Sequence, residues 1–393
     1  MSANHDLDDY HWLVGSQASS YLEKVEQSDW PLHRLVASLR RDLSATRTHL
    51  ILEQATLRRR AAAKFSRPDQ MFFTAVGLEQ ATDQWLAHYK AQRFPRGPVA
   101  DLCCGLGGDL IALAGRGVAR GVDRDPITAL LAEVNCRSVG HPSRVDVCNA
   151  ESFALTDFEA WHIDPDRRAS GRRTRNLDEA TPSLTTIQQR LRDHPNGAVK
   201  LSAAMDVPRD WSEQVELEWI SRQHHCRQLV VWFGDLATEA GHRRATLFGN
   251  DTRPIRTVIG APSERLPVTR DVGPYLVEPD SAVLAANLAD TLAIELGLTT
   301  ALPGGVYFTS DHPIDDCAVN TFEVTHVMPY HPRRVRQLLR SRGIGGLEIK
   351  TRGVDHQPEQ VRKELAANGQ IEATLFVIRV DRSVLAILSR RLP

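Results

Sequence analysis

"VADLCCGLGGDLIALAG", residues 99–115, is the stretch that decides the fold of this chain. Its first residues form a short apolar run that predicts a buried strand, and the last seven have the spacing of a helix. Between the two lie Gly105, Gly107 and Gly108, which let the backbone turn tightly and approach a ligand. The helix that follows offers unpaired N–H groups and the positive end of its dipole. The stretch therefore predicts a strand–turn–helix unit that holds a ligand.

An acid follows at the distance that a nucleotide site requires. Asp123 ends the next apolar run, "VARGVD", about twenty residues further on, where a carboxylate accepts hydrogen bonds from both ribose hydroxyls. A dinucleotide site prefers the pattern G-x-G-x-x-G, but this chain has Asp109 where a pyrophosphate would lie. An acid there repels phosphate and suits the ammonium of a methionine moiety, so S-adenosylmethionine fits better than NAD. The alternative is a tight turn that binds no ligand.

Strands alternate with helices on both sides of this stretch. The runs "RVDVCN", "WHID" and "AVKLS" continue the alternation, which is typical of a Rossmann-like, doubly wound α/β sheet, and we expect the later runs up to "RRATLFG" to close its edge as antiparallel strands. We divide the chain into four segments: a helical region at 1–95, the sheet domain at 96–270, a connecting segment at 271–319 and an α+β module at 320–393.

Composition limits the functional classes. A chain of 393 residues with a net charge of −1 has room for two or three domains and is no global polycation, so any nucleic-acid contact comes from a local patch. Its six cysteines lack Cys-x-x-Cys spacing, and His224–His225 has no matching ligands, so we expect no metal and reduced thiols in a cytoplasm. No run approaches the ~18 apolar residues of a membrane helix, so we also expect no membrane partner. The oligomeric state stays open.

At these residues the chain resembles the class I S-adenosylmethionine-dependent methyltransferases. "DLCCGLGGD" resembles their first motif, and "MFFTAVGLEQAT" (71–82) is similar to the segment that precedes the sheet in trimethylguanosine synthase-like enzymes, where it helps to close over the cofactor. The alternative for that segment is that Phe72 and Phe73 dock the helical region. "CNAES" implies an adenine contact at Asn149, or at Glu151 if the alignment slips. The cofactor residues implied are Phe73, Thr74, Asp101, Cys103, Gly105, Gly107, Asp109, Asp123, Arg124 and Asn149.

The fourth strand ends in "IDPDRR", residues 163–168. In the amino-methylating families an Asp/Asn-Pro-Pro-aromatic motif lies here, where the side chain and the prolyl carbonyl accept hydrogen bonds from the target amine. This chain keeps Asp164 and Pro165, but Arg167 replaces the aromatic that stacks on the base. We therefore assign Asp164 and the Pro165 carbonyl to orienting the acceptor, and Arg167 and Arg168 to binding it. The alternative is that these arginines order the loop by pairing with nearby acids.

Residues 320–393 resemble the THUMP-like domain that accompanies a bacterial group of S-adenosylmethionine-dependent methyltransferases, through "FEVTHVMPY", "GLEIKTRG" and "ATLFVIRV". THUMP domains belong to RNA-modifying enzymes, so the resemblance implies an RNA partner. Helical spacing puts three arginines of one predicted helix on one face, and two basic residues of a predicted strand share one side. The resulting phosphate patch would contain Arg333, Arg336, Arg340, Lys350 and Arg352. The alternative is an ordinary charged outer face.

These observations lead to three hypotheses about function. The first is a methyltransferase that acts on an RNA base nitrogen with S-adenosylmethionine as cofactor. The second is an RNA-binding protein that keeps the cofactor but no longer transfers the methyl group. The third is a methyltransferase whose acceptor is a small molecule or a protein. The loss of the aromatic platform weakens any acceptor borrowed from the amino-methylating families, a capped guanosine above all.

Overall fold

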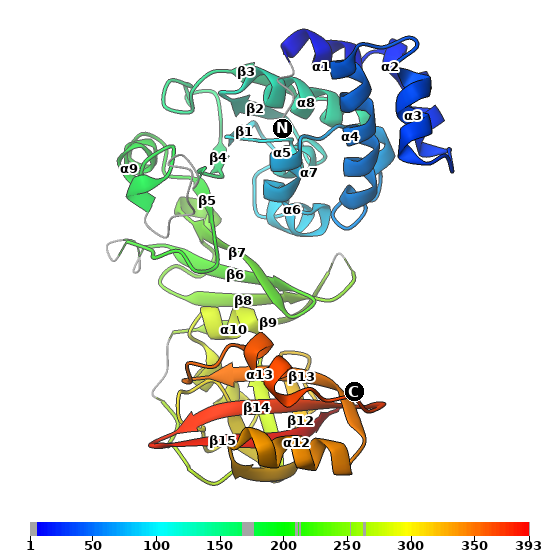
Figure 1. The fold of residues 1–393 in the computed structure, drawn as a ribbon. Coiled ribbons are helices and arrows are strands. Elements are labelled where there is room, and N and C mark those ends of the chain that lie inside the picture. Colours follow the sequence, from blue (N-terminus) through cyan, green and yellow to red (C-terminus); the bar gives the residue numbers. More distant parts are fainter. Residues whose placement is uncertain are drawn as a thin grey trace. The chain divides into compact units, whose positions relative to one another are not determined.

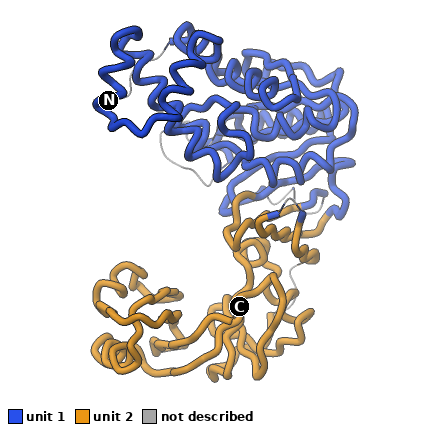
Figure 2. Tube along the Cα trace, turned by 90° about the vertical axis from the view of Figure 1, so that its right-hand side faces the viewer, with its two compact units in different colours: residues 1–216, 229–240, 251–253 blue, residues 217–228, 241–250, 254–393 orange. Residues whose placement is uncertain are grey.

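The structure is a computed structural model that describes residues 6–166, 177–208, 211, 214–251, 253–261 and 265–392. The chain forms two compact units, coloured blue and orange in Figure 2. The first comprises residues 1–216, 229–240 and 251–253, and the second comprises residues 217–228, 241–250 and 254–393. The predicted acceptor residues Arg167 and Arg168 lie outside the described residues.

The N-terminal region is helical, as the sequence predicts. Short polar residues begin several of its helices: Ser44 caps one, Thr74 a second and Asp83 a third, each by accepting a backbone N–H. Apolar side chains of this region, among them Leu13 and Ile51 on helices and Phe73 just before α5, form one buried core. The helices are α1 (Leu7–Leu13), α2 (Ser16–Glu26), α3 (Leu32–Leu39), α4 (Ala45–Ala61), α5 (Ala75–Gln80) and α6 (Gln84–Ala91), with a 3₁₀ turn at Pro68–Gln70.

A nine-stranded sheet follows, in the order β3-β2-β1-β4-β5-β7-β6-β8-β9 (Figure 1). Strands β1 to β5 run parallel, which confirms the predicted Rossmann-like architecture. The strands are β1 (Val99–Leu102), β2 (Ala119–Asp123), β3 (Arg144–Val147), β4 (Ala160–Ile163), β5 (Gly197–Leu201), β6 (Glu216–Arg222), β7 (His225–Trp232), β8 (Arg243–Phe248) and β9 (Pro254–Gly260). The helices between them are α7 (Gly108–Ala114), α8 (Pro126–Ser138) and α9 (Leu184–Asp193).

The edge of this sheet differs from the expected run of antiparallel strands. Strand β7 is antiparallel to β5, as expected, but β6 and β8 pair parallel. The physical reason is the connection after β7: the chain passes through the segment 233–242 before it begins β8, so it enters β8 in the same direction as β6. A connection of that length allows a parallel pair where a tight hairpin would not.

The order of the parallel strands defines the switch point of the sheet. The chain leaves β1 toward β2 on one side of the sheet, whereas β4 lies on the other side of β1, so the direction of winding reverses there. Leu102, the last residue of β1, lies opposite Val122 on β2 and Ile163 on β4. The residues that follow these three strands therefore meet at one edge. Open α/β sheets bind ligands at this switch point.

The C-terminal module is built on a six-stranded sheet, in the order β11-β10-β12-β15-β14-β13. Its strands are β10 (Tyr275–Pro279), β11 (Phe308–Ser310), β12 (Val319–Pro329), β13 (Ile344–Arg352), β14 (Ile371–Val380) and β15 (Ser383–Arg391). Its helices are α10 (Ser281–Ala285), α11 (Ala289–Glu295), α12 (Pro332–Ser341) and α13 (Pro358–Leu365). The helix and the strand that the sequence predicts for the basic residues of this module are both present, as α12 and β13. The segment 271–319 is more than a connector, because β10 and β11 extend the same sheet.

The two faces of this sheet bury different apolar groups. Val335 of α12 and Val361 of α13 pack with Leu347, Ile349 and Leu375 on one face. Phe376 lies on the opposite face, where its ring centroid is 4.9 Å from that of Phe322 and 5.1 Å from that of Tyr307. Side chains alternate along β13 and β14, so each one lies either on the face that α12 and α13 cover, the helix-covered face, or on the face that carries Phe376, the aromatic face.

Within the described residues, no helix is long and apolar enough to cross a membrane.

Replacing Phe376 with alanine tests the aromatic face. The side chain is fully buried, so its loss removes transfer free energy and leaves a cavity; we expect the free energy of unfolding of the C-terminal module to fall by about 3–5 kcal/mol. Ile371→Ala on the same strand is the control, because that side chain is 57% exposed and its loss should cost no more than about 0.5 kcal/mol. Hydrogen exchange of the β14 amides measures both, and equal losses would contradict the assignment of the core.

Candidate functional site

The glycine turn between β1 and α7 has an open side and a packed side. Cys103, Gly105 and Gly107 have positive φ values of 58°, 55° and 85°, so the turn uses the left-handed region of backbone space. A Cβ atom added to Gly105 would meet nothing within 4 Å, which shows open space in front of the turn. A Cβ added to Gly108 would lie 2.8 Å from the carbonyl oxygen of Thr82. The turn thus packs against Thr82 at Gly108, its packed side, and is accessible at Gly105, its open side.

Asp123 lies beside the open side of the turn, as the sequence predicts. Its Oδ2 accepts a hydrogen bond of 3.0 Å from the Gly105 N–H, and its Oδ1 accepts one of 3.0 Å from the Asp125 N–H. Burial raises the pKa of Asp123, although these two backbone donors oppose the shift. The carboxylate remains partly exposed and keeps lone pairs for further donors. The structure therefore joins the turn and its acid into one site.

Asp109 has a partner that the sequence analysis did not foresee. Its Oδ1 lies 2.7 Å from Lys90 Nζ, and its Oδ2 accepts a hydrogen bond of 2.7 Å from the Thr82 hydroxyl. Burial would raise the pKa of Asp109, but Lys90, with smaller contributions from His162 and Lys200, more than offsets it and lowers the pKa overall. The carboxylate that was expected to receive an ammonium group of the ligand is thus already neutralised by Lys90. It anchors the first turn of α7 to α6.

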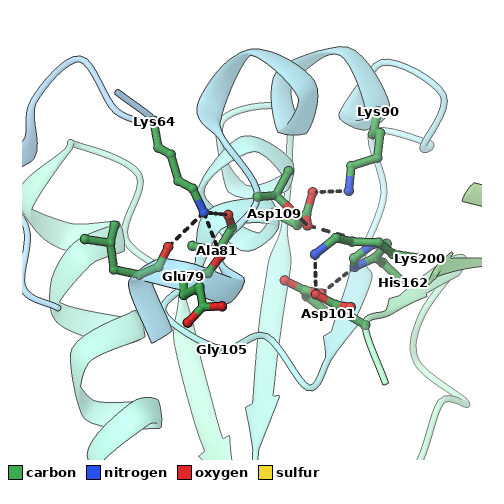
Figure 3. Close-up of polar contacts among 12 residues, drawn as sticks. Lys64, Glu79, Ala81, Lys90, Asp101, Gly105, Asp109, His162 and Lys200 are labelled. Atoms are coloured by element: carbon green, nitrogen blue, oxygen red, sulfur yellow. Dashed lines mark hydrogen bonds and ion pairs between the residues drawn. The ribbon is translucent and has the colours of Figure 1, made fainter. Parts of the chain in front are cut away.

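A second buried pair lies next to the first. His162 Nδ1 on β4 is 2.7 Å from Asp101 Oδ1 on β1, and both side chains are buried. Burial raises the pKa of Asp101, while the attraction of His162 opposes that shift. His162 Nε2 lies 4.0 Å from Asp109 Oδ2, so the two pairs form one charged cluster beneath the turn. The predicted ligand residue Asp101 therefore lies in this cluster, behind the turn (Figure 3).

The end of β4 brings the predicted acceptor residue Asp164 to the same edge. The Asp164 N–H donates to the Leu102 carbonyl at 3.4 Å, so this residue continues the pairing of β4 with β1. Lys200 on β5 donates to Asp164 Oδ2 through its ammonium group. Pro165 is buried, and Asp166 lies 3.7 Å from the guanidinium of Arg124, another predicted cofactor residue. Asp164 therefore has a cationic neighbour from the adjacent strand.

The segment that precedes the sheet is held by backbone contacts. Thr74 caps α5 by accepting the Gly77 N–H at 3.0 Å, and Lys64 donates to the carbonyls of Leu78, Glu79 and Ala81 at its other end. The Phe73 side chain is buried in the helical core, with its ring centroid 5.7 Å from that of Phe65. The placement of Phe73 favours docking of the helical region, which was the alternative role for this residue.

The remaining predicted cofactor residues lie at the edges of the site. Cys103 follows β1, and burial, with the nearby charge of Asp123, raises the pKa of its thiol, which disfavours the thiolate form. Asn149 is exposed beyond the end of β3, and its carbonyl accepts the Ser152 N–H at 3.0 Å. Glu151 is also exposed. An adenine contact from Asn149 or Glu151 stays a prediction.

Sequence reasoning missed Lys90, His162 and Lys200, although one signal pointed to the lysines. The chain has only six lysines against 42 arginines, and Lys64, Lys90 and Lys200 all lie around this site. An ammonium is compact whereas a guanidinium is planar and larger, so the two are not interchangeable at a tightly packed position. Lys90 lies at such a position, because its side chain is only 1% exposed.

The second unit carries the predicted basic patch only in part. Arg333, Arg336 and Arg340 share one face of α12, as predicted, and with Gln337 and Ser341 they line a surface hollow of about 550 Å³. Val335 and Leu339 on the opposite face pack into the core. The Arg336 guanidinium also donates to the Glu364 carbonyl, so Arg333 and Arg340 are the more accessible cations.

Lys350 and Arg352 do not join that patch. Strand β13 directs Leu347 and Ile349 to the helix-covered face, so Lys350 and Arg352 lie on the aromatic face, across the sheet from α12. Lys350 Nζ is 2.8 Å from Glu278 of β10, and this ion pair neutralises its charge. The prediction of one patch from all five residues is therefore wrong. Spacing along the strand correctly gave the shared side, but not which face α12 covers.

Within the part of the chain that the structure describes, no three His, Cys, Asp or Glu side chains form a metal site. His224 lies 3.2 Å from Asp280, whose other oxygen caps α10 through the Ala282 N–H.

The chain is similar to known proteins over most of its length. The chain is 30% identical over 351 residues to a protein of two Mycobacterium tuberculosis strains that is named an uncharacterized S-adenosylmethionine-dependent methyltransferase; the match covers 86% of this chain and 94% of that relative. A family model described as THUMP domain-like matches residues 319–391. The solved structure of a candidate methyltransferase from Porphyromonas gingivalis is similar in fold over 100% of both chains, with a TM-score of 0.73 at 18% identity.

Lys90→Met tests the charged cluster beneath the turn. The variant leaves the Asp109 carboxylate buried without its ammonium partner, so we expect the free energy of unfolding at pH 7 to fall by about 3–5 kcal/mol. The lowered pKa of Asp109 stabilises the native chain above the ordinary Asp pKa of about 3.9, and this contribution is lost as the pH falls through the native value. The difference between the variant and the native chain should therefore shrink below about pH 4.

The matched control is Lys24→Met. The Lys24 ammonium donates to Ser38 at an exposed site, so its loss should change stability by no more than about 0.5 kcal/mol. Urea unfolding at several pH values measures both variants. A Lys90→Met protein as stable as the control would show that the pair does not hold the turn.

Proposed function

This chain belongs to the S-adenosylmethionine-dependent methyltransferases, and from that membership we propose that it transfers a methyl group from this cofactor to a base nitrogen of RNA. The observation that carries the proposal is the meeting of three strand ends at the switch point. There the glycine turn after β1, Asp123 after β2 and Asp164 after β4 lie at one edge of the sheet. One half of this edge fits a cofactor and the other half fits an acceptor.

The residues at the turn fit S-adenosylmethionine. Asp123 would hold the ribose hydroxyls, because its carboxylate already lies against the turn and remains partly exposed. Gly105 leaves open space in which the ligand can approach the backbone, and the N-terminus of α7 follows directly. Asp109 and Lys90 would fix this surface from behind. The cofactor, when bound, supplies a methyl carbon on a positively charged sulfur.

Asp164 and Pro165 would orient the acceptor. The Asp164 side chain is one-third exposed at the carboxyl end of β4, where it can accept a hydrogen bond from an N–H group of a base. Methyl transfer is an in-line displacement, so holding the acceptor nitrogen in line with the carbon–sulfur bond supplies much of the rate. Arg167 and Arg168 stay proposed contacts to the acceptor, and Asn149 a proposed contact to adenine.

The C-terminal module supports RNA as the acceptor. Its match to the THUMP domain-like family covers the whole of β12 to β15, and α12 presents three arginines around a hollow. Arginines grouped in this way bind phosphates, and the affinity then falls steeply with salt. An RNA acceptor would place the enzyme in the cytoplasm, where its cysteines, free in this structure, would remain reduced.

Transfer of a labelled methyl group from the cofactor to total RNA tests the proposal directly.

The variant Asp123→Ala tests the cofactor site. Loss of this carboxylate removes the proposed ribose acceptor, so we expect cofactor affinity to fall by roughly tenfold or more, as the loss of a charged hydrogen bond of about 1.5–3 kcal/mol implies. Calorimetry measures the affinity. Native affinity in the variant would contradict the assignment of Asp123.

Asp125→Ala is the matched control, because this acid lies two residues away and caps α8. It should cost about 1 kcal/mol of stability and leave cofactor affinity unchanged. Tight cofactor binding by the native protein without transfer to RNA would instead favour a binding protein that has lost catalysis. Label that reaches protein or small molecules, but not RNA, would favour the third hypothesis.

The double variant Arg333→Glu/Arg340→Glu tests the α12 surface. If both side chains contact phosphates, RNA affinity should fall and the slope of log affinity against log salt should decrease by about 2. Arg382→Glu in the exposed hairpin turn after β14 is the control and should change neither by a comparable amount. Filter binding at several salt concentrations measures both quantities. An unchanged slope in the double variant would exclude α12 as the RNA contact.

A further inference from the structure

We propose that Lys200 is a specificity-determining residue of this site, and that the Asp164–Lys200 pair selects a ring nitrogen of a lactam, an N–H group next to a C=O group. This inference rests on the proposed function and names the substrate class within it. A base of this class carries its acceptor nitrogen beside an exocyclic oxygen, as at N1 of guanine or N3 of uracil.

The pair is fixed by the pairing of two neighbouring strands. Ile163 on β4 lies opposite Val199 on β5, so the next residues of the two parallel strands, Asp164 and Lys200, lie side by side at the edge where the strands end. The Lys200 ammonium donates to Asp164 Oδ2. The Lys200 side chain is 12% exposed and that of Asp164 is 33% exposed. The Asp164 carboxylate is thus partly exposed, and the less exposed Lys200 ammonium contacts one of its two oxygens.

The charges around Lys200 hold the ammonium in place. Asp164 from β4 contacts it, and its positive charge also acts on Asp109 of α7, where it helps to lower the pKa of that carboxyl. Within the described residues, Lys200 is the side-chain partner of Asp164 and bonds it through Oδ2. The other oxygen, Oδ1, is then the group that can accept from a substrate. An ammonium has three donors, so its bond to Asp164 does not by itself prevent a contact with another oxygen.

An acceptor oxygen beside a donor matches a particular edge of a base. The N–H of a lactam would donate to Asp164 Oδ1, and the adjacent C=O would accept from the Lys200 ammonium. The charges of Asp164 and Lys200 cancel, so the pair has no net negative charge to compensate a cationic acceptor such as a protein amine. Burying such an acceptor would therefore be unfavourable.

The charge that develops during transfer separates a lactam from an exocyclic amine. When an amine attacks, positive charge grows on its nitrogen, and a neighbouring ammonium opposes this. When a lactam nitrogen loses its proton, negative charge spreads to the exocyclic oxygen, and a neighbouring ammonium stabilises it. Lys200 therefore favours the lactam.

The step balances without a further reactant. The ring nitrogen forms a bond to the methyl carbon as the carbon–sulfur bond breaks, and the sulfur keeps the electron pair of that bond. The proton of the ring nitrogen passes to Asp164 and then to water. The products are the N-methylated base, the neutral thioether of the cofactor and one released proton.

Lys200→Met tests the inference, with total RNA from a strain that lacks the gene and tritium-labelled S-adenosylmethionine as substrates. We expect native cofactor affinity and a single-turnover rate that falls by roughly 10²-fold, as for loss of one donor to a developing oxyanion. Without the ammonium, the lactam should lose its proton at higher pH, so the midpoint of the pH–rate profile should move up by roughly 1–3 units. Lys200→Arg, which keeps the charge, should restore most of this shift.

Three outcomes separate the inference from the function on which it rests. No transfer to RNA by the native protein would overturn both. Transfer to RNA with an exocyclic N-methyl product, identified by nucleoside mass spectrometry, would overturn the lactam inference alone. So would a Lys200→Met variant with the native pH midpoint, because a merely structural role lowers the rate without moving that midpoint. A ring N-methylated lactam together with the upward shift supports the inference.

Discussion

The buried ion pair between Lys90 and Asp109 is the interaction on which the rest of the site depends. Asp109 lies in the first turn of α7, and Lys90 lies on α6, so the pair ties the helix that begins after the glycine turn to the helical N-terminal region. Removing two charges from water is costly, and the structure compensates with a 2.7 Å contact, the Thr82 hydroxyl and the nearby His162. The turn is therefore held from behind while its front stays open.

His162 links the Lys90–Asp109 pair to the end of β4, next to Asp164. It bonds Asp101 at 2.7 Å, lies 4.0 Å from Asp109 and stands on β4, two residues before Asp164, which follows that strand. A shift of the turn would therefore disturb the strand that presents Asp164, and Asp164 is in turn held by Lys200. Transfer between two bound molecules requires such coupling, because a small misplacement of either one lowers the rate.

Local patterns predicted the parts of this site that lie at the ends of single strands. The glycine turn, Asp123 and the position of Asp164 after β4 follow from short runs and from the parallel order of the strands. The contacts made by Lys200 did not, since Lys200 is 36 residues from Asp164 and the contact depends on the register of β5. The same limit applied to Lys350, whose partner Glu278 is 72 residues away on β10, a strand that its short sequence did not reveal. The charge of Lys350 suggested a contact with phosphate, whereas the order of the strands places the Glu278 carboxylate beside it.

Methylated-nucleoside profiling of total RNA from a deletion strain tests the central claim most directly. The account predicts that one methylated nucleoside, a base methylated at a ring lactam nitrogen, disappears, and that it returns with the native gene but not with an Asp164→Ala variant that still binds the cofactor. An RNA nucleoside profile identical to that of the parent strain would contradict the claim that this methyltransferase acts on RNA.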